Sequence, residues 1–195
     1  VVALVGAWME SETAAERPKG KTLLSWAQVR ELVNSGLVEV ASHSYDLHHG
    51  VLSNPQANEQ AAATTHAFDA DLRQYEDDEE YRQRINAAVA QSANFIWQHA
   101  GVRPRIIVWP FGEYNEWLIE AARDAGMPHT MALWDGLNTL ADLRAMRRLL
   151  IADDPNEKQF AAIVEGLRAD RPLRVIHLDM DYIHDRDPEQ TERNL

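Results

Sequence analysis

The order of short apolar runs and amphipathic segments limits the fold of this chain more than any other feature. Runs rich in Val, Ile and Leu alternate with segments whose apolar residues recur every three or four positions. The expected strands cover residues 1–8, 37–41, 105–109, 131–134, 149–152 and 173–178, and the expected helices cover residues 26–35, 78–100, 116–125 and 155–167. Such alternation predicts an α/β fold with a parallel sheet, either open or closed into a barrel.

Residues typical of helix ends support these boundaries. Ser25 and Asn115 are expected to cap the N-termini of their helices, and Gly36 and Gly126 follow the C-termini. The segment Asp154-Pro155-Asn156-Glu157 resembles a capping box with proline at the first helical position. Residues 43–75 show no clear period, and a long loop in a compact domain is usually functional.

Composition excludes several classes of function. The formal net charge of -12 argues against nucleic acid as a partner, because phosphates favour clustered Lys and Arg. The absence of cysteine excludes disulfides and thiolate chemistry. No apolar run approaches the length of a membrane span, and no signal peptide is visible. The chain begins at Val1 inside an expected strand, so we predict that its natural start lies upstream.

Two loops carry the candidate chemistry, and each follows an expected strand. The first, after residues 37–41, contains His43, His48 and His49, while the second, after residues 105–109, contains Phe111 and Gly112. In parallel α/β folds, reactive groups follow the carboxyl ends of strands, so both loops are expected at one edge of the sheet.

The three histidines admit two interpretations. Neutral imidazole is a common ligand of zinc-like metals, and a strand end followed by a turn would allow His43 and His48 to bind one ion. The alternative is a solvent-facing turn, or core histidines held by backbone hydrogen bonds. A catalytic metal needs about three protein ligands, and Asp46, Glu113 and Asp135 are the candidates for the third.

The segment Ser42-His43-Ser44-Tyr45-Asp46-Leu47-His48 resembles the H-[ST]-x-x-x-H motif of NodB-type polysaccharide deacetylases. Residues 26–31, 108–113 and 176–182 resemble further segments of the subgroup that deacetylates poly-β-1,6-N-acetylglucosamine in biofilms, in the same order. The resemblance covers nearly the whole chain. It implies a (β/α) barrel of the polysaccharide-deacetylase type that is incomplete, because the first strands are missing.

The resemblance also implies a metal-dependent hydrolase that removes N-acetyl groups from this polymer during exopolysaccharide maturation and export. His43 and His48 match the metal ligands, and the metal would be Zn, Ni, Co or Fe. The family's catalytic Asp base and third ligand belong to an Asp-Asp motif that is absent from this chain. The backbone N–H of Phe111 would face the oxyanion. The substrate-binding candidates are Trp109, Pro110, Gly112 and Tyr114.

By the same resemblance, residues 1–172 form the deacetylase domain, truncated at its N-terminus. Residues 173–195 then begin a glycosidase-like domain. The expected location is the periplasm, in association with the outer membrane, with an export-machinery partner. Two rival functions stay open, namely a glycoside hydrolase that uses Asp179 and Asp181, and a non-catalytic carbohydrate-binding module. Sensitivity to chelators would separate a metal enzyme from a glycosidase.

Overall fold

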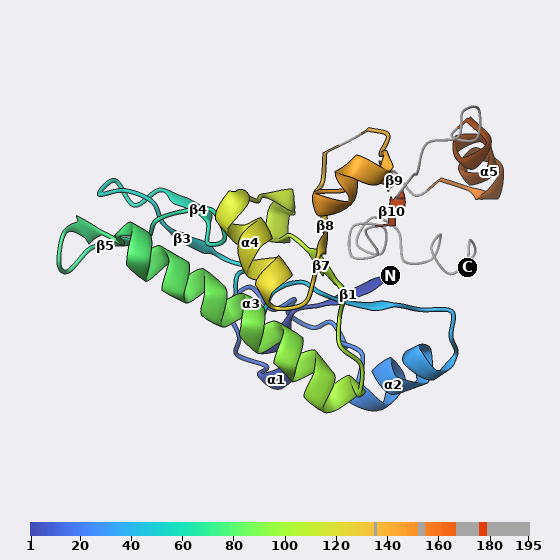
Figure 1. Cartoon of the computed structure of the whole chain (residues 1–195), viewed down its shortest axis with the longest axis horizontal. Coiled ribbons are helices and arrows are strands. Elements are labelled where there is room, and N and C mark those ends of the chain that lie inside the picture. The colour runs from blue at the N-terminus through green and yellow to red at the C-terminus, as the bar shows by residue number, and fades with distance from the viewer. Residues whose placement is uncertain (135, 152–154, 167–175, 179–195) are drawn as a thin grey trace. The chain divides into compact units, whose positions relative to one another are not determined.

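A parallel four-stranded sheet forms the centre of the first part of the chain (Figure 1). The computed structural model describes residues 1–134, 136–151, 155–166 and 176–178, which fall into two compact units divided between residues 132 and 133. In the first unit the strand order is β1 (Val2–Leu4), β2 (Val40–Ser42), β7 (Ile106–Val108) and β8 (His129–Met131). All three pairings are parallel, which confirms the predicted α/β class.

Three helices of this unit begin at polar caps. The side chain of Ser25 accepts a hydrogen bond from Gln28 N at the start of α2 (Trp26–Asn34). The side chain of Asp77 accepts one from Glu80 N at the start of α3 (Asp78–Ala100). Asn115 caps α4 (Glu116–Asp124). Each cap satisfies a backbone N–H that has no partner inside the helix, so short polar signals in the sequence locate these helix starts correctly.

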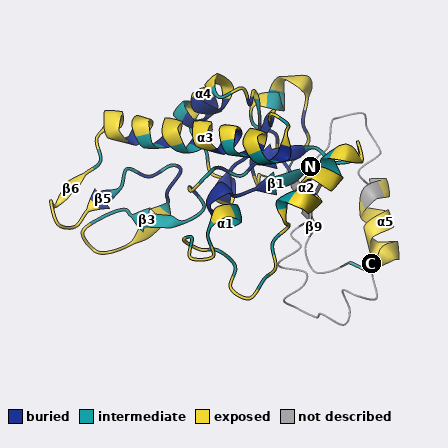
Figure 2. Cartoon of the chain, turned by 90° about the horizontal axis from the view of Figure 1, so that it is seen from below, coloured by how far each residue is buried: buried dark blue, intermediate teal, exposed yellow. Residues whose placement is uncertain are grey.

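The long helix α3 links two hydrophobic clusters. Its first part packs Tyr81, Ile85 and Val89 into a cluster with β7 and α4, which includes Ile107, Trp109 and Leu118. Its last turns pack Ile96 and Ala100 against Leu4, Val29 and Val40 from β1, α2 and β2. Figure 2 shows exposed residues along the outer side of α3 and buried residues where it meets the sheet. The predicted apolar face of this helix is confirmed.

The first predicted strand is wrong in its second half. After β1 the chain forms the helix α1 (Gly6–Glu10), which carries Trp8. The turn into this helix is held by the next loop of the sheet, because Gly6 N donates to Ser44 O at 3.1 Å and Ala7 N donates to Tyr45 O at 2.8 Å. Tertiary hydrogen bonds therefore override the apolar character of residues 5–8. The predicted strand at 131–134 is also shifted, since β8 ends at Met131.

Residues 43–75 contain two antiparallel ribbons where the sequence predicted a loop. The first pairs β3 (Gly50–Leu52) with β4 (Glu59–Ala61), and the second pairs β5 (Phe68–Asp69) with β6 (Gln74–Tyr75). Strands this short carry too few residues for a visible period of two.

Arg84 of α3 binds the segment of residues 43–76, which we call the insertion, to the helix. Arg84 Nε and Nη2 donate to the two carboxylate oxygens of Glu76, both at 2.7 Å. The same guanidinium donates to the carbonyl oxygens of Ala62 at 2.8 Å and Thr65 at 2.9 Å. Burial alone would raise the pKa of Glu76, but the hydrogen bonds from Arg84 and from Ala67 N outweigh burial and lower it. Arg84 therefore anchors residues 62–65.

The second unit contains the short helix η2 (Leu140–Arg144), the strands β9 (Leu149–Ile151) and β10 (Ile176–Leu178), and the helix α5 (Glu157–Gly166). The two strands pair in parallel. The helix α5 is capped by Asn156, whose side chain accepts from Gln159 N at 3.1 Å, so the cap lies two residues beyond the expected Asp154. Asp154 and the expected domain boundary at 172/173 lie outside the described residues. Among the described helices, none has the length and apolar character needed to cross a bilayer.

Candidate functional site

The loop after β2 positions His43 at the carboxyl end of the sheet. His43 N donates to Leu4 O at 2.8 Å, which extends the pairing of β2 with β1 by one residue. On the other side, the His43 ring nitrogen Nδ1 lies 2.5 Å from Val108 O at the end of β7. A backbone carbonyl bonded to one ring nitrogen fixes the orientation of the imidazole. The Val108 carbonyl thus holds the His43 ring at the carboxyl end of β7.

A tight turn brings His48 back toward His43. Ser44 has a left-handed backbone with φ of 66°, which is uncommon outside glycine. The turn is stabilised by two buried hydroxyls, because Ser42 Oγ accepts from Ser44 N at 2.9 Å and Ser44 Oγ accepts from Leu47 N at 3.0 Å. Ser42 Oγ also lies 2.6 Å from Ser92 Oγ of α3. The small polar residues of the motif therefore shape the turn.

The rings of His43 and His48 converge, with centroids 4.9 Å apart and planes inclined by 57°. Burial lowers the pKa of His48, so its imidazole is neutral near pH 7, as metal binding requires. Its Nδ1 atom is buried and has no hydrogen-bond partner among the described residues. A buried ring nitrogen without a partner is unfavourable. A cation ligated by this pair would fit the available donors.

His49 has a different role from the other two histidines. Its Nδ1 lies 2.9 Å from Gly50 O and its Nε2 lies 3.1 Å from Asp46 O. Both ring nitrogens thus face backbone carbonyl oxygens. The structure brings together His43 and His48, and it gives His49 the backbone-bound arrangement that was the alternative for the whole cluster.

The second loop reaches the same site through Phe111. This residue lies in the short 3-10 turn η1 (Pro110–Gly112), with φ of 56°, and its ring centroid is 4.6 Å from that of His48. A left-handed bulky residue is a backbone outlier, and such outliers cluster at functional sites. Phe111 is 43% exposed, so its ring contacts His48 from the surface of the protein and is not part of the core.

The other candidates of the second loop lie deeper than expected for sugar contacts. Trp109 is fully buried within the core cluster, so its ring faces are not available to stack on a sugar, which corrects the expectation for that residue. Pro110 and Gly112 are buried as well. Tyr114 is partly buried and packs against the same cluster. Because aromatic side chains serve both core packing and ligand contacts, the sequence pattern could not separate these roles.

Within the part of the chain that the structure describes, no third candidate ligand lies with the pair. Among the described residues, no group of three or more His, Asp or Glu side chains is placed to hold one ion. Asp46 is exposed, and Glu113 accepts a hydrogen bond from Thr64 Oγ1 at 2.7 Å. Asp135, together with Asp179 and Asp181 of the rival glycosidase hypothesis, lies outside the described residues.

Trp8 is a site residue that the sequence did not identify. Its ring centroid lies 4.9 Å from that of His48, on the α1 side of the pair. The sequence placed Trp8 in a strand, where its direction would have been toward the core. No pattern in the sequence pointed to Trp8, and the structure shows the cause, because the chain turns into α1 at Gly6, where a Cβ would collide with the Tyr45 ring.

Comparison with known proteins agrees with this arrangement. The family model described as "Polysaccharide deacetylase" matches residues 1–130. The chain is 32% identical, over 201 residues, to a protein of Escherichia coli K12 named poly-beta-1,6-N-acetyl-D-glucosamine N-deacetylase. This alignment covers 100% of the chain and 30% of that protein, so the chain spans about a third of its curated relative.

Two solved structures resemble the chain in both sequence and fold. The deacetylase domain of BpsB from Bordetella bronchiseptica is 40% identical, with a TM-score of 0.69, and the match covers 75% of this chain and 58% of that one. A de-N-acetylase from Aggregatibacter actinomycetemcomitans is 34% identical, with a TM-score of 0.70, and covers 82% and 63% respectively. These matches confirm the predicted fold type. Enzymes of this family depend on a metal.

Proposed function

Because this chain belongs to the polysaccharide deacetylase family, we propose that it contributes the histidine half of the metal site in an enzyme that removes N-acetyl groups from a β-1,6-linked N-acetylglucosamine polymer. The observation that carries this proposal is the convergence of the His43 and His48 rings at the carboxyl end of β2. His43 and His48 are five positions apart, and this spacing alone does not predict that their rings lie close together.

The residues divide the chemistry between two loops. His43 and His48 would hold the divalent ion, and the Val108 carbonyl orients the His43 ring. When bound, the metal polarises the amide carbonyl and lowers the pKa of a water molecule. The Phe111 N–H donates to the acetyl oxygen as negative charge develops there. The Phe111 and Trp8 rings, both within 5 Å of the His48 ring centroid, limit access of bulk water.

The proton acceptor is not assigned to any residue of this chain. Part of the polypeptide outside it would supply the carboxylate base and the third ligand. The proposed substrate is the neutral N-acetylated polymer, and the products are acetate and a glucosamine unit. We place the enzyme in the periplasm with the export machinery as a partner, by analogy with its exopolysaccharide-modifying relatives.

Single substitutions in the full-length protein test this assignment. We expect His43→Ala and His48→Ala each to abolish metal uptake, measured by elemental analysis, and acetate release from acetylated glucosamine oligomers. His49→Ala is the matched control, because its ring nitrogens face backbone carbonyls, and it should retain both. An equal loss from His49→Ala would contradict the ligand assignment. Activity that survives exhaustive chelation would contradict the metal mechanism.

A further inference from the structure

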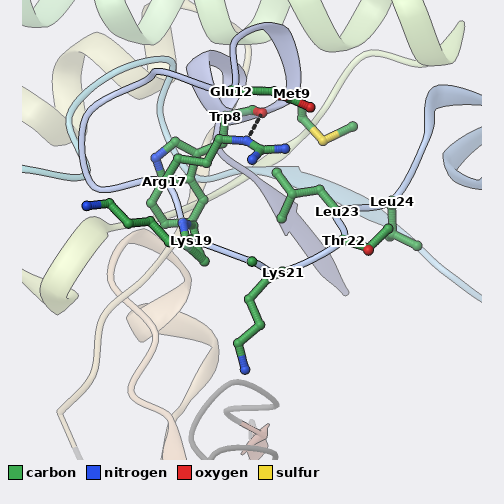
Figure 3. Close-up of a pocket in the computed structure, with 11 residues that line it drawn as sticks. Trp8, Met9, Glu12, Arg17, Lys19, Lys21, Thr22, Leu23 and Leu24 are labelled. Carbon is green, nitrogen blue, oxygen red and sulfur yellow. Dashed lines mark hydrogen bonds between the residues drawn. The ribbon is translucent and has the colours of Figure 1, made fainter.

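A pocket of about 680 Å³ opens next to the candidate site (Figure 3). It is lined by residues of α1 and of the segment that leads to α2, including Trp8, Met9, Glu12 and Arg17. This volume falls within the range of about 300–1,000 Å³ that is usual for small-molecule sites. The functional assignment above does not use it.

Trp8 is shared between the pocket and the histidine pair. Its ring lies 4.9 Å from the His48 ring and also lines the pocket. The Trp8 indole N–H donates to Ala15 O at 2.9 Å, and Arg17 Nε donates to Trp8 O at 3.1 Å. These two bonds tie the loop after α1 back onto the helix. The position of Trp8 between the pocket and the His48 ring is thus held by specific hydrogen bonds, and a ligand that reached from the pocket to the histidine pair would contact Trp8.

The charge of the pocket is opposite to that of the whole chain. Three cationic residues, Arg17, Lys19 and Lys21, fall within five positions, and Glu12 is the one acidic residue that lines the same pocket. The formal net charge of the chain is -12. Figure 3 shows the Lys19 and Lys21 side chains extending from the loop at the edge of the pocket, with Arg17 folded toward Trp8. The lining of the pocket therefore carries a formal excess of positive charge within an acidic protein.

We propose that this pocket is a subsite for a neighbouring sugar of the polymer, and that its basic edge selects a neutral N-acetylated unit over a cationic glucosamine unit. This inference rests on the proposed function. An N-acetyl group carries no charge, whereas the free amine left by deacetylation is protonated in mildly acidic solution. Like charges raise the free energy of the complex with a glucosamine at this position. The enzyme would then avoid positions beside a unit that has already been deacetylated.

Binding measurements on the chain test this selectivity. The probes are two β-1,6-linked hexamers, one fully N-acetylated and one with alternating glucosamine units, compared by calorimetry at pH 6. We expect the acetylated hexamer to bind more tightly, and Lys19→Glu to reduce the ratio of the two Kd values about threefold at low salt. The effect should fade at 0.5 M salt. Trp8→Ala should weaken both hexamers to a similar extent.

Arg123→Glu is the matched control, because it reverses one exposed charge on α4, which does not line the pocket. A ratio that shifts equally in both variants would overturn the proposal, since the effect would then come from net charge alone. A ratio unchanged by Lys19→Glu would also overturn it while leaving the proposed function intact. Failure of both hexamers to bind the unmodified chain would overturn the polymer assignment and this subsite together.

Discussion

The anchor formed by Arg84 gives the most direct test of how the site is supported. We consider Arg84→Met, which replaces the aliphatic part of the side chain with an unbranched apolar one and removes the guanidinium charge and its donors. Four hydrogen bonds between 2.7 and 2.9 Å are lost. The Glu76 carboxylate, whose side chain is only 12% exposed, is left without its cation. Two carbonyl groups of the insertion lose their donor as well.

The magnitude follows from burial and charge. Breaking a fully buried ion pair from one side costs about 3–5 kcal/mol. The Arg84 side chain is 29% exposed, so water compensates in part, and we expect a loss of about 2–4 kcal/mol in the free energy of unfolding. In a chain of this size that corresponds to a fall in Tm of roughly 5–12 °C.

Urea unfolding followed by circular dichroism measures this loss, and hydrogen exchange locates it. Arg82→Met is the matched control, because Arg82 is exposed and lies over the Trp117 ring at 4.3 Å, a contact worth about 0.5–1 kcal/mol. Exchange should increase in residues 62–76 for Arg84→Met and stay unchanged there for Arg82→Met. If the two variants lose stability equally, the proposed role of Arg84 as an anchor is wrong.

The remaining predictions concern pH and packing. Glu76 has a lowered pKa in the folded state, so its contribution is present above its ordinary pKa and is lost as pH falls through the folded value. The stability difference between the native chain and Glu76→Gln should therefore shrink below about pH 4, in urea titrations at several pH values. Gly6→Ala should cost about 1–3 kcal/mol, because its new methyl group would collide with the Tyr45 ring. Ser42→Ala should cost about 1–3 kcal/mol, since it removes a buried partner of Ser92, and thermal unfolding checks both variants.

The sequence predicted the elements whose local signals agree with their tertiary environment. The helix α3 begins at Asp78 and ends at Ala100 as expected, because its cap and its apolar face point to the same register. The helix α1 was missed, since residues 5–8 are apolar and the hydrogen bonds that turn them come from Ser44 and Tyr45, about 38 positions away. The spacing of apolar residues reflects only neighbouring positions, so it cannot predict a hydrogen bond between residues this far apart in the sequence.

The candidate site was also predictable only where local sequence patterns determine it. The sequence identified His43, His48 and Phe111, and the structure brings their rings together. It did not identify Trp8, which reaches His48 only because the chain turns at Gly6. It also offered Trp109 for sugar stacking, whereas that ring is fully buried against α3 and α4. The residue types therefore indicated which chemistry is possible, whereas the packing of the chain decides whether a given aromatic ring lies at the site or in the core.

Ser42 and Ser44, beside and between the two histidines, shape the turn that brings the His43 and His48 rings together. Five positions separate His43 from His48, a spacing that would direct the rings apart on a helix. The left-handed Ser44 and the Ser42 hydroxyl reverse the chain within that span, and the pairing of His43 with Leu4 fixes where the reversal begins. The bond from Ser42 to Ser92 then connects the turn to α3, the helix that links both hydrophobic clusters. The position of the His43–His48 pair is therefore set by the core of the fold, because the same helix contacts the sheet, residues 62–76 and the turn between the two histidines.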